Sequence, residues 1–144
     1  MKLPRLLFMI QEIEKNPTSY KFINRVLPMP PYDIYMAKTH WKQLGYFVNG
    51  LMVGSILFSD MTESSHIRYT VVLEKYKGAA INKEMVAEVE KLAKQKGFNR
   101  ITTNIRQSNI SSLRSFLGRG FLIYRADRYY KDGELKISLV KRLY

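Results

Sequence analysis

Residues 66–95 constrain the fold more than any other part of the chain, because the apolar pattern changes period within them. His66–Leu73 is a β-branched and aromatic run, typical of a strand. The following apolar residues recur at helical spacing; they are Ile81, Met85, Val86, Val89, Leu92 and Ala93. Gly97 is placed to end this helix, and residues 100–105 form a short strand. A strand, a helix and a second strand in succession predict one parallel step in the sheet.

The remaining strands are predicted to pair mainly as antiparallel hairpins. Asn49-Gly50 and Asp132-Gly133 each separate two strand-like runs, and both dipeptides favour tight hairpin turns. A short helix is expected over residues 109–117, before Gly118 or Gly120. The expected strands are 44–48, 51–58, 66–73, 100–105, 121–130 and 134–140.

The first 43 residues are predicted to hold two helices and a proline loop. Leu6, Leu7, Ile10 and Ile13 recur at helical spacing after Pro4, and Asn16-Pro17 is a typical helix start. Residues 28–31 contain three prolines, which indicates a loop. The element order is therefore ααβββαβαββ. We expect one α/β domain over 1–144, with 1–43 carrying the helices and loop and 44–144 a mixed, mostly antiparallel six- to seven-stranded sheet.

The chain is strongly basic, and the charge is uneven. Its 144 residues include 24 Lys and Arg against 12 Asp and Glu, a net charge of +12. Residues 73–144 hold 16 basic and 7 acidic side chains, a net +9, whereas residues 1–72 hold a net +3. Such a charge favours partners rich in phosphate, including nucleic acid, although a solvated basic surface would give the same count.

Composition excludes several classes of protein. The chain has no cysteine, which excludes disulfides, a cysteine nucleophile and thiolate metal sites. With only His40 and His66, we expect no metal. We also expect no membrane-spanning segment and no signal peptide, and therefore a cytoplasmic protein.

The loop between the third strand and the long helix is a candidate anion site. It contains Lys75, Lys77, Gly78, Ala79 and Ala80, so small side chains and positive charge meet at a helix start. The first N–H groups of a helix have no partner within it and lie at the positive end of the dipole. Phosphate binding is one interpretation; an ordinary helix start with solvated lysines is the other.

This loop and a second motif, at residues 109–121, resemble two motifs that occur in the same order in the GNAT superfamily of acyl-CoA-dependent N-acetyltransferases. The family loop is written Arg/Gln-x-x-Gly-x-Gly/Ala; here it reads Lys75 to Ala80, with Gly78 and Ala80 matching and Lys75 departing from the usual first residue. The second motif is Asn109, Ser112, Phe116 and Gly120-Phe121. The resemblance covers about residues 44–141 and implies acetyl-CoA as cosubstrate, with the N-terminal helices helping to form the acceptor site.

The resemblance also implies roles for particular residues. Backbone groups of Val71, Val72 and Leu73 would bind the pantetheine arm and polarise the thioester. N–H groups from Gly78 to Ile81 would hold the pyrophosphate. Asn109 would either contact the pantetheine or orient the short helix. Many family members have a Tyr acid where this chain has Phe116, so another group serves, the thiolate leaves unaided, or the protein binds acyl-CoA without catalysis.

His66 and Tyr124 are the first candidates for proton transfer, with Glu63 as a reserve base and Tyr129 and Tyr130 as weaker candidate acids. His66 opens the third strand and has an ordinary pKa near ~6.5, which suits a base that deprotonates the amine. Tyr124 is a candidate acid for the thiolate. Each also has a non-catalytic interpretation: His66 as a surface histidine at a strand edge, and Tyr124 as a tyrosine packed in a strand.

The expected function is N-acetyl transfer to the primary amine of an anionic or nucleic-acid-associated acceptor. The alternative is a non-catalytic module of this fold that binds nucleic acid or acyl-CoA. Arg100, Arg125 and Arg128 are among the arginines that favour nucleic acid. A homodimer is also expected to be feasible, with the last strand, 136–144, at an edge.

Overall fold

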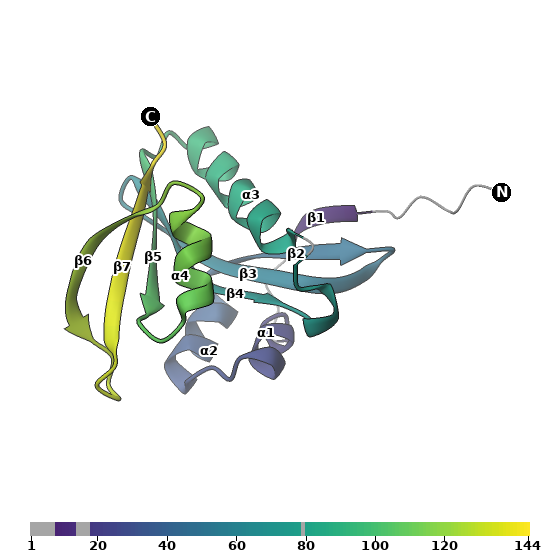
Figure 1. Cartoon of the computed structure of the whole chain (residues 1–144). Helices are drawn as coiled ribbons and strands as arrows, with labels where there is room; N and C mark the ends of the chain where they lie inside the picture. The colour runs from purple at the N-terminus through teal and green to yellow at the C-terminus, as the bar shows by residue number, and fades with distance from the viewer. Residues whose placement is uncertain (1–7, 14–17, 79) are drawn as a thin grey trace. The chain divides into compact units, whose positions relative to one another are not determined.

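A mixed seven-stranded sheet organises the chain, in the order β1-β2-β3-β4-β5-β7-β6 (Figure 1). The computed structural model describes residues 8–13, 18–78 and 80–144. The strands are β1 Phe8–Ile13, β2 Lys42–Val48, β3 Leu51–Met61, β4 Ser64–Val72, β5 Arg100–Arg106, β6 Leu122–Tyr129 and β7 Leu135–Arg142. The helices are α1 Lys21–Val26, α2 Pro31–Thr39, α3 Ile81–Gln95 and α4 Ile110–Leu117, with a short 3₁₀ helix, η1, at Glu74–Tyr76.

The predicted mixture of strand directions is confirmed. β4 and β5 pair in parallel, through Ser64–Ile67 and Arg100–Thr103. β1 with β2, β2 with β3, β5 with β7 and β6 with β7 pair antiparallel. Asn49 and Gly50 both have positive φ, 50° and 82°, as the predicted hairpin turn requires. In the described part of the chain, no helix combines the length and apolarity needed to span a bilayer.

The first predicted helix is wrong where the structure describes it. Phe8–Ile13 is strand β1, paired antiparallel with β2. Most of β1 is exposed, so its helix-like apolar spacing does not mark a buried face. Pairing with β2 satisfies its backbone, and this long-range contact overrides the local pattern. Pro4 and Asn16-Pro17 lie outside the described residues.

Helix α2 was not predicted, because the prolines before it indicate a loop. Pro30 is extended, with φ −65° and ψ 156°, and Pro31 is the first helical residue. A proline fits there because the first N–H of a helix has no partner within the helix. Asp33, in the first turn, adds a favourable charge at the positive end of the helix dipole.

The described residues fall into two compact units, and β3, β4 and α3 run from one into the other. The first unit contains the chain up to Ser59 together with Tyr69–Val89. The second contains Asp60–Arg68 and Glu90–Tyr144.

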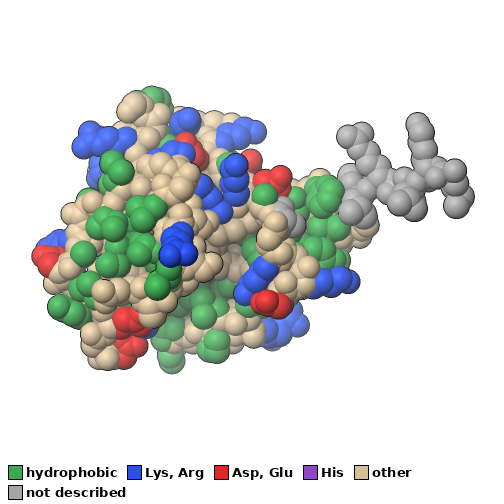
Figure 2. Space-filling view, in the orientation of Figure 1, with side chains coloured by type: hydrophobic (Ala, Val, Ile, Leu, Met, Phe, Trp, Pro, Cys, Tyr) green, Lys and Arg blue, Asp and Glu red, His purple; other side chains and the backbone are tan. Residues whose placement is uncertain are grey.

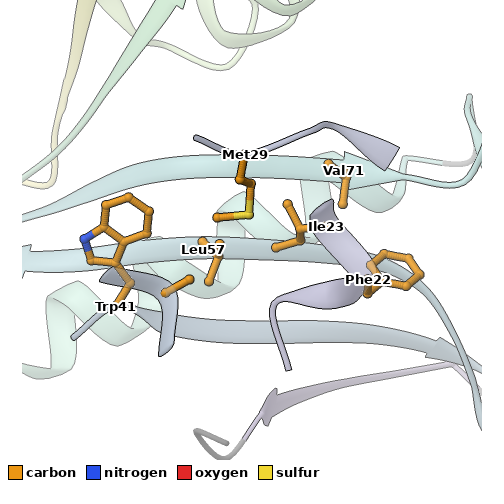
Figure 3. Packing of buried hydrophobic residues seen from close by; sticks show 7 residues of the cluster. Phe22, Ile23, Met29, Trp41, Leu57 and Val71 are labelled. Atoms are coloured by element: carbon orange, nitrogen blue, oxygen red, sulfur yellow. The ribbon is translucent and has the colours of Figure 1, made fainter. Parts of the chain in front are cut away.

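The core of the first unit lies between the N-terminal helices and the sheet. Ile23 of α1 and Leu57 of β3 are fully buried, and Trp41 is 4% exposed (Figure 3). Tyr69 of β4 also reaches α2, since its hydroxyl donates a 2.5 Å hydrogen bond to Asp33. The cluster is Phe22, Ile23, Met29, Ala37, Trp41, Leu57 and Val71.

Helix α3 covers the opposite face of this part of the sheet. A Cβ built on Gly54 of β3 would lie 3.1 Å from Ile81 and 3.4 Å from Met85. The predicted apolar face of α3 is confirmed, because Ile81, Met85 and Val89 are all at most 3% exposed. Because the helix approaches β3 so closely, any larger residue at position 54 would require the side chains of Ile81 and Met85 to shift slightly.

The second unit has one apolar and one polar face along β5 and β7. Ile101 and Leu139 are fully buried, whereas Thr102 and Val140, their neighbours in the chain, face the other way and are partly exposed. Lys141 shares the apolar side and contacts Glu90 of α3 at 3.1 Å. The last strand was predicted to lie at an edge, which is wrong: β7 is paired with β5 and β6, and β6 is the edge strand (Figure 1).

Candidate active site

The segment between β4 and α3 turns at Gly78, whose φ of +86° lies in the left-handed region that glycine favours. A Cβ added there would meet no atom within 4 Å, so the space beside Gly78 is open. Ala80 also has a positive φ, 61°, which is uncommon for a residue with a side chain. Ala79 lies outside the described residues. This loop therefore offers exposed backbone at the beginning of α3.

The start of the loop is anchored to the sheet. The N–H of Leu73 donates a 2.9 Å hydrogen bond to Val53 O on β3. η1 follows, and Tyr76 N donates to Leu73 O at 2.8 Å. Val71, 4% exposed, packs its side chain into the core, so only its backbone is available to a ligand. Val72 and Leu73 are half-buried.

Both predicted lysines of the loop are exposed, and Lys77 is paired. Its Nζ lies 2.9 Å from Glu74 Oε2, at the surface. Lys75 Nζ lies 5.8 Å from the centre of the Tyr76 ring. A surface ion pair contributes only about 0–1 kcal/mol, so Lys77 can exchange Glu74 for a phosphate at little cost.

Helix α3 opens directly after the loop. The hydrogen bond from Glu84 N to Ala80 O, 3.0 Å, is part of its first turn. The preceding N–H groups, of Ile81, Asn82 and Lys83, belong to the set that a helix leaves without internal partners. The side chain of Ile81 is 3% exposed and fixes this end of the helix on the sheet. The arrangement suits an anion held by backbone N–H groups.

Asn109 and Ser112 belong to the second unit, where Asn109 caps α4. The Oδ1 of Asn109 accepts a 3.2 Å hydrogen bond from Ser112 N. Glu134 of the β6–β7 hairpin positions the approach to the helix, since its Oε1 accepts a 2.8 Å hydrogen bond from Ser108 N. The sequence left two roles open for Asn109, contact with the pantetheine arm and orientation of the short helix. This hydrogen bond corresponds to the second role.

Asn109→Ala should lower the free energy of unfolding by ~1 kcal/mol, because it removes this N-cap. Asn109→Asp keeps an acceptor oxygen and should unfold at nearly the parent temperature. Thermal unfolding followed by circular dichroism measures both. If the cap is the whole role, Asn109→Asp also keeps the parent affinity for acetyl-CoA; a large loss of affinity in a stable Asn109→Asp protein would instead indicate a direct contact through the amide.

Phe116 is part of the core of the second unit. It is 3% exposed, and its ring meets Phe121 edge-to-face with centroids 5.0 Å apart. The Arg119 guanidinium lies 5.8 Å from the Phe116 ring, and burial lowers the pKa of Arg119. Position 116 thus carries no proton donor and fills apolar space.

His66 and Tyr124, the two proton-transfer candidates, line the same pocket. This pocket, of about 820 Å³, is formed by β4, β5, β6 and β7 within the second unit. Tyr124 is 57% exposed, so its simpler interpretation as a packed tyrosine does not hold. The structure brings these two residues to one cavity, and their catalytic roles stay predictions.

His66 belongs to a chain of polar contacts on the floor of the pocket. Its Nδ1 shares a 2.7 Å hydrogen bond with Thr102 Oγ1, and its Nε2 lies 3.5 Å from Asn104 Nδ2. Ser138 Oγ donates to Asn104 Oδ1 at 2.8 Å. Burial, and then the positive charges of Arg68 and Lys136, lower the pKa of His66 to about 4. The imidazole is therefore neutral at pH 7 and is a weaker base than its ordinary pKa suggests.

The stability of the protein should fall in mild acid because of His66. The pKa is near ~6.5 in the unfolded chain and about 4 in the folded protein. Between these values the unfolded chain binds a proton that the folded protein does not, so the unfolding free energy drops by up to roughly 3 kcal/mol as the pH falls through this window.

Denaturant unfolding between pH 7 and pH 4 tests this expectation. His66→Gln should flatten the pH dependence, whereas His40→Gln, at an exposed position, should leave it as in the parent. Equal slopes for the parent and His66→Gln would contradict the lowered pKa of His66.

Comparisons with known proteins establish the family of the chain. The family model for the acetyltransferase (GNAT) family matches residues 9–121, and the chain belongs to this family. As a member, it is an acyltransferase. No curated protein matches its sequence.

Solved structures show the same fold at low identity. An IAA acetyltransferase from Bacillus cereus ATCC 14579 is 17% identical with a TM-score of 0.84, over 94% of this chain and 99% of that one. The ribosomal-protein-S18-alanine N-acetyltransferase from Escherichia coli is 16% identical with a TM-score of 0.78, over 95% and 94%. A GNAT family acetyltransferase from Elizabethkingia anophelis with acetyl-CoA bound is 18% identical with a TM-score of 0.77, over 94% and 97%.

Sequence reasoning missed most of the pocket. Thr102 and Asn104 of β5, and Lys136 and Ser138 of β7, line it. They alternate with buried residues, which are apolar except for Thr103, so the two-residue period of these strands was an available signal. In the described part of the chain, no three His, Asp or Glu side chains cluster as metal ligands would.

Proposed function

We propose that this chain is an N-acetyltransferase that transfers the acetyl group of acetyl-CoA to the primary amine of an anionic acceptor. The observation that carries the proposal is the turn at Gly78, where open space, backbone in the left-handed region and the start of α3 coincide. Membership of the GNAT family supports the cosubstrate. The family model spans residues of both compact units, which supports a single functional domain over residues 1–144.

The loop would bind acetyl-CoA by its phosphates and by its thioester arm. The N–H groups from Gly78 to Ile81, together with Lys75 and Lys77, would hold the pyrophosphate. The backbone of Val71–Leu73 would bind the pantetheine arm. β4 continues to Val72, but only Ser64–Ile67 pair with β5. The backbone of the last residues of β4 is therefore not paired with β5, which supports its proposed role in binding the arm.

The reaction is direct attack. The amine nitrogen attacks the thioester carbonyl carbon, the C–S bond breaks, and the coenzyme A thiolate leaves. The amine loses one proton, and the thiolate takes one up to form the free thiol. His66, neutral at pH 7, would accept the amine proton through water, and Tyr124 would supply the proton to sulfur. Because thiols ionise near ~8.5, the thiolate is also a fair leaving group without an acid.

A thiol-release assay tests the proposal. The chain has no cysteine, so a thiol reagent present during turnover reports coenzyme A alone. We expect thiol release from acetyl-CoA to depend on a primary amine in a screen that includes aminoacyl, nucleotide and peptide amines. Mass spectrometry should show an added acetyl group on the same acceptor. Binding of acetyl-CoA without amine-dependent release in any class would contradict the proposed function.

A further inference from the structure

We propose that the pocket of about 820 Å³ in the second unit binds the amine acceptor through phosphate groups that the acceptor carries. The inference rests on the proposed acetyltransferase function only in naming this ligand as the acceptor. The pocket lies on the polar face of β4, β5, β7 and β6, and its lining includes no residue of the Val71–Ile81 loop.

The lining has charged side chains of one sign only, all of them cationic. It contains six Arg and Lys side chains and not one Asp or Glu. The cations come from all four strands, so they surround the cavity rather than follow one strand. They are Arg68, Arg100, Arg125, Arg128, Lys136 and Arg142.

Four cations of the second unit outside the pocket, Lys94, Lys96, Arg106 and Lys141, lie against carboxylates. The pairs outside the pocket are Lys96–Asp60, Arg106–Asp132, Arg106–Glu134, Lys94–Glu90 and Lys141–Glu90. Figure 2 shows acidic side chains in red beside some of the blue cations on one face of the whole chain. In the pocket, Arg125 pairs with Asp127 at 2.7 Å, but no described residue forms an ion pair with Arg128, Lys136 or Arg142.

Unbalanced like charges around one cavity repel one another and raise the local positive potential. The effect is visible on His66, since Arg68 and Lys136 both contribute to lowering its pKa. A bound anion would relieve this repulsion. The pocket therefore favours a negatively charged ligand, unlike a surface on which positive and negative side chains alternate.

Five of the six cations are arginines, which bind phosphate oxygens in pairs through a planar fork of N–H donors. The hydroxyls of Thr102 and Ser138 add neutral polar groups on the floor. Because each phosphate carries up to about two charges, one or two phosphates match three cations that lack an ion pair among the described residues, Arg128, Lys136 and Arg142, within the volume of a drug-sized pocket. Tyr144 also lines the cavity and gives aromatic surface for a base. The shared chemistry fits a nucleotide or a nucleic-acid chain end.

The experiment measures binding of two probes to the whole chain with saturating coenzyme A present. The probes are inorganic tripolyphosphate, by calorimetry, and a fluorescent single-stranded oligoribonucleotide of about ten nucleotides, by anisotropy. The pocket variant is Arg128→Glu with Arg142→Glu. Its matched control is Arg114→Glu with Lys131→Glu, the same change of net charge at exposed positions outside the lining.

We expect the pocket variant to bind tripolyphosphate at least about tenfold more weakly than the parent, because each lost charge-assisted hydrogen bond is worth about that factor or more. The control should stay within about twofold of the parent. Equal losses in the two variants, or displacement of tripolyphosphate by coenzyme A, would overturn the proposal, the latter because the coenzyme's own phosphates would then occupy the pocket.

The oligoribonucleotide identifies the source of the phosphates. Tighter binding than tripolyphosphate, with an affinity that falls steeply with salt and depends on the pocket residues, indicates a nucleic-acid chain. Weaker binding indicates a small phosphorylated amine. Failure of the proposed function would appear differently, as a parent protein that acetyl-CoA does not stabilise while probe binding still depends on Arg128 and Arg142.

Discussion

Gly78→Asp is expected to abolish acetyl-CoA binding, with a loss of at least about a hundredfold in affinity. Gly78 has a φ of +86° and open space beside it, which is where a pyrophosphate would meet the backbone. An aspartate would place both a side chain and a negative charge in that space. Near a protein surface, a carboxylate and a phosphate about 4 Å apart repel by about 4 kcal/mol, which is a hundredfold or more in affinity. Calorimetric titration with acetyl-CoA measures the loss.

Gly78→Asn is the matched control for this prediction. Asparagine has nearly the shape of aspartate, tolerates the left-handed region comparatively well and carries no charge. Its affinity for acetyl-CoA should therefore fall less than that of Gly78→Asp, and both variants should keep the parent circular dichroism spectrum. Equal affinities for the parent and a folded Gly78→Asp protein would show that no phosphate lies beside this residue.

The second large effect is expected on stability, from Leu57→Ala. Leu57 is fully buried in the cluster that joins α1, Trp41 and the sheet (Figure 3). Removing its branched side chain loses apolar burial and leaves a cavity, which typically costs about 3 kcal/mol. For a chain of this size the melting temperature should fall by about 10 °C.

Leu51→Ala provides the comparison on the same strand. Leu51 of β3 is 61% exposed, so its truncation should change the melting temperature by no more than a few degrees. Thermal unfolding of the two variants, followed by circular dichroism, separates burial from strand propensity. Similar melting temperatures for Leu57→Ala and Leu51→Ala would contradict the described core.

Most of the fold after residue 43 could be predicted from the sequence, because local signals agree with the tertiary structure there. Asn49-Gly50 forms the turn that its type favours, and the 3.6-residue period of α3 marks the face that is buried. At the N-terminus the local sequence signals and the tertiary structure disagree. Phe8–Ile13 has helical spacing but pairs with β2, and Pro31 starts a helix although it would interrupt one elsewhere.

The candidate site could be predicted only where it is continuous in the sequence. The loop from Lys75 to Ala80 is one segment, so its residues can be recognised together. The cationic pocket is assembled from β4, β5, β7 and β6. Its composition depends on β7 lying between β5 and β6 and on which side chains of each strand share a face, and neither follows from local pattern. The uneven charge of the second half of the chain, with Arg100, Arg125 and Arg128 in it, and the two-residue period of β5 and β7 were the sequence signals for it.

Thermal unfolding of the parent protein with and without acetyl-CoA tests the central claim most directly. A ligand that binds only the folded state at about 100 times its Kd adds ~2.7 kcal/mol to the unfolding free energy. We predict that acetyl-CoA raises the melting temperature of the parent protein by several degrees. In the Arg128→Glu, Arg142→Glu protein, acetyl-CoA should still raise the melting temperature, whereas an equal concentration of tripolyphosphate should not. An unchanged melting temperature of the parent at millimolar acetyl-CoA would contradict the assignment of the Gly78 loop as a coenzyme site.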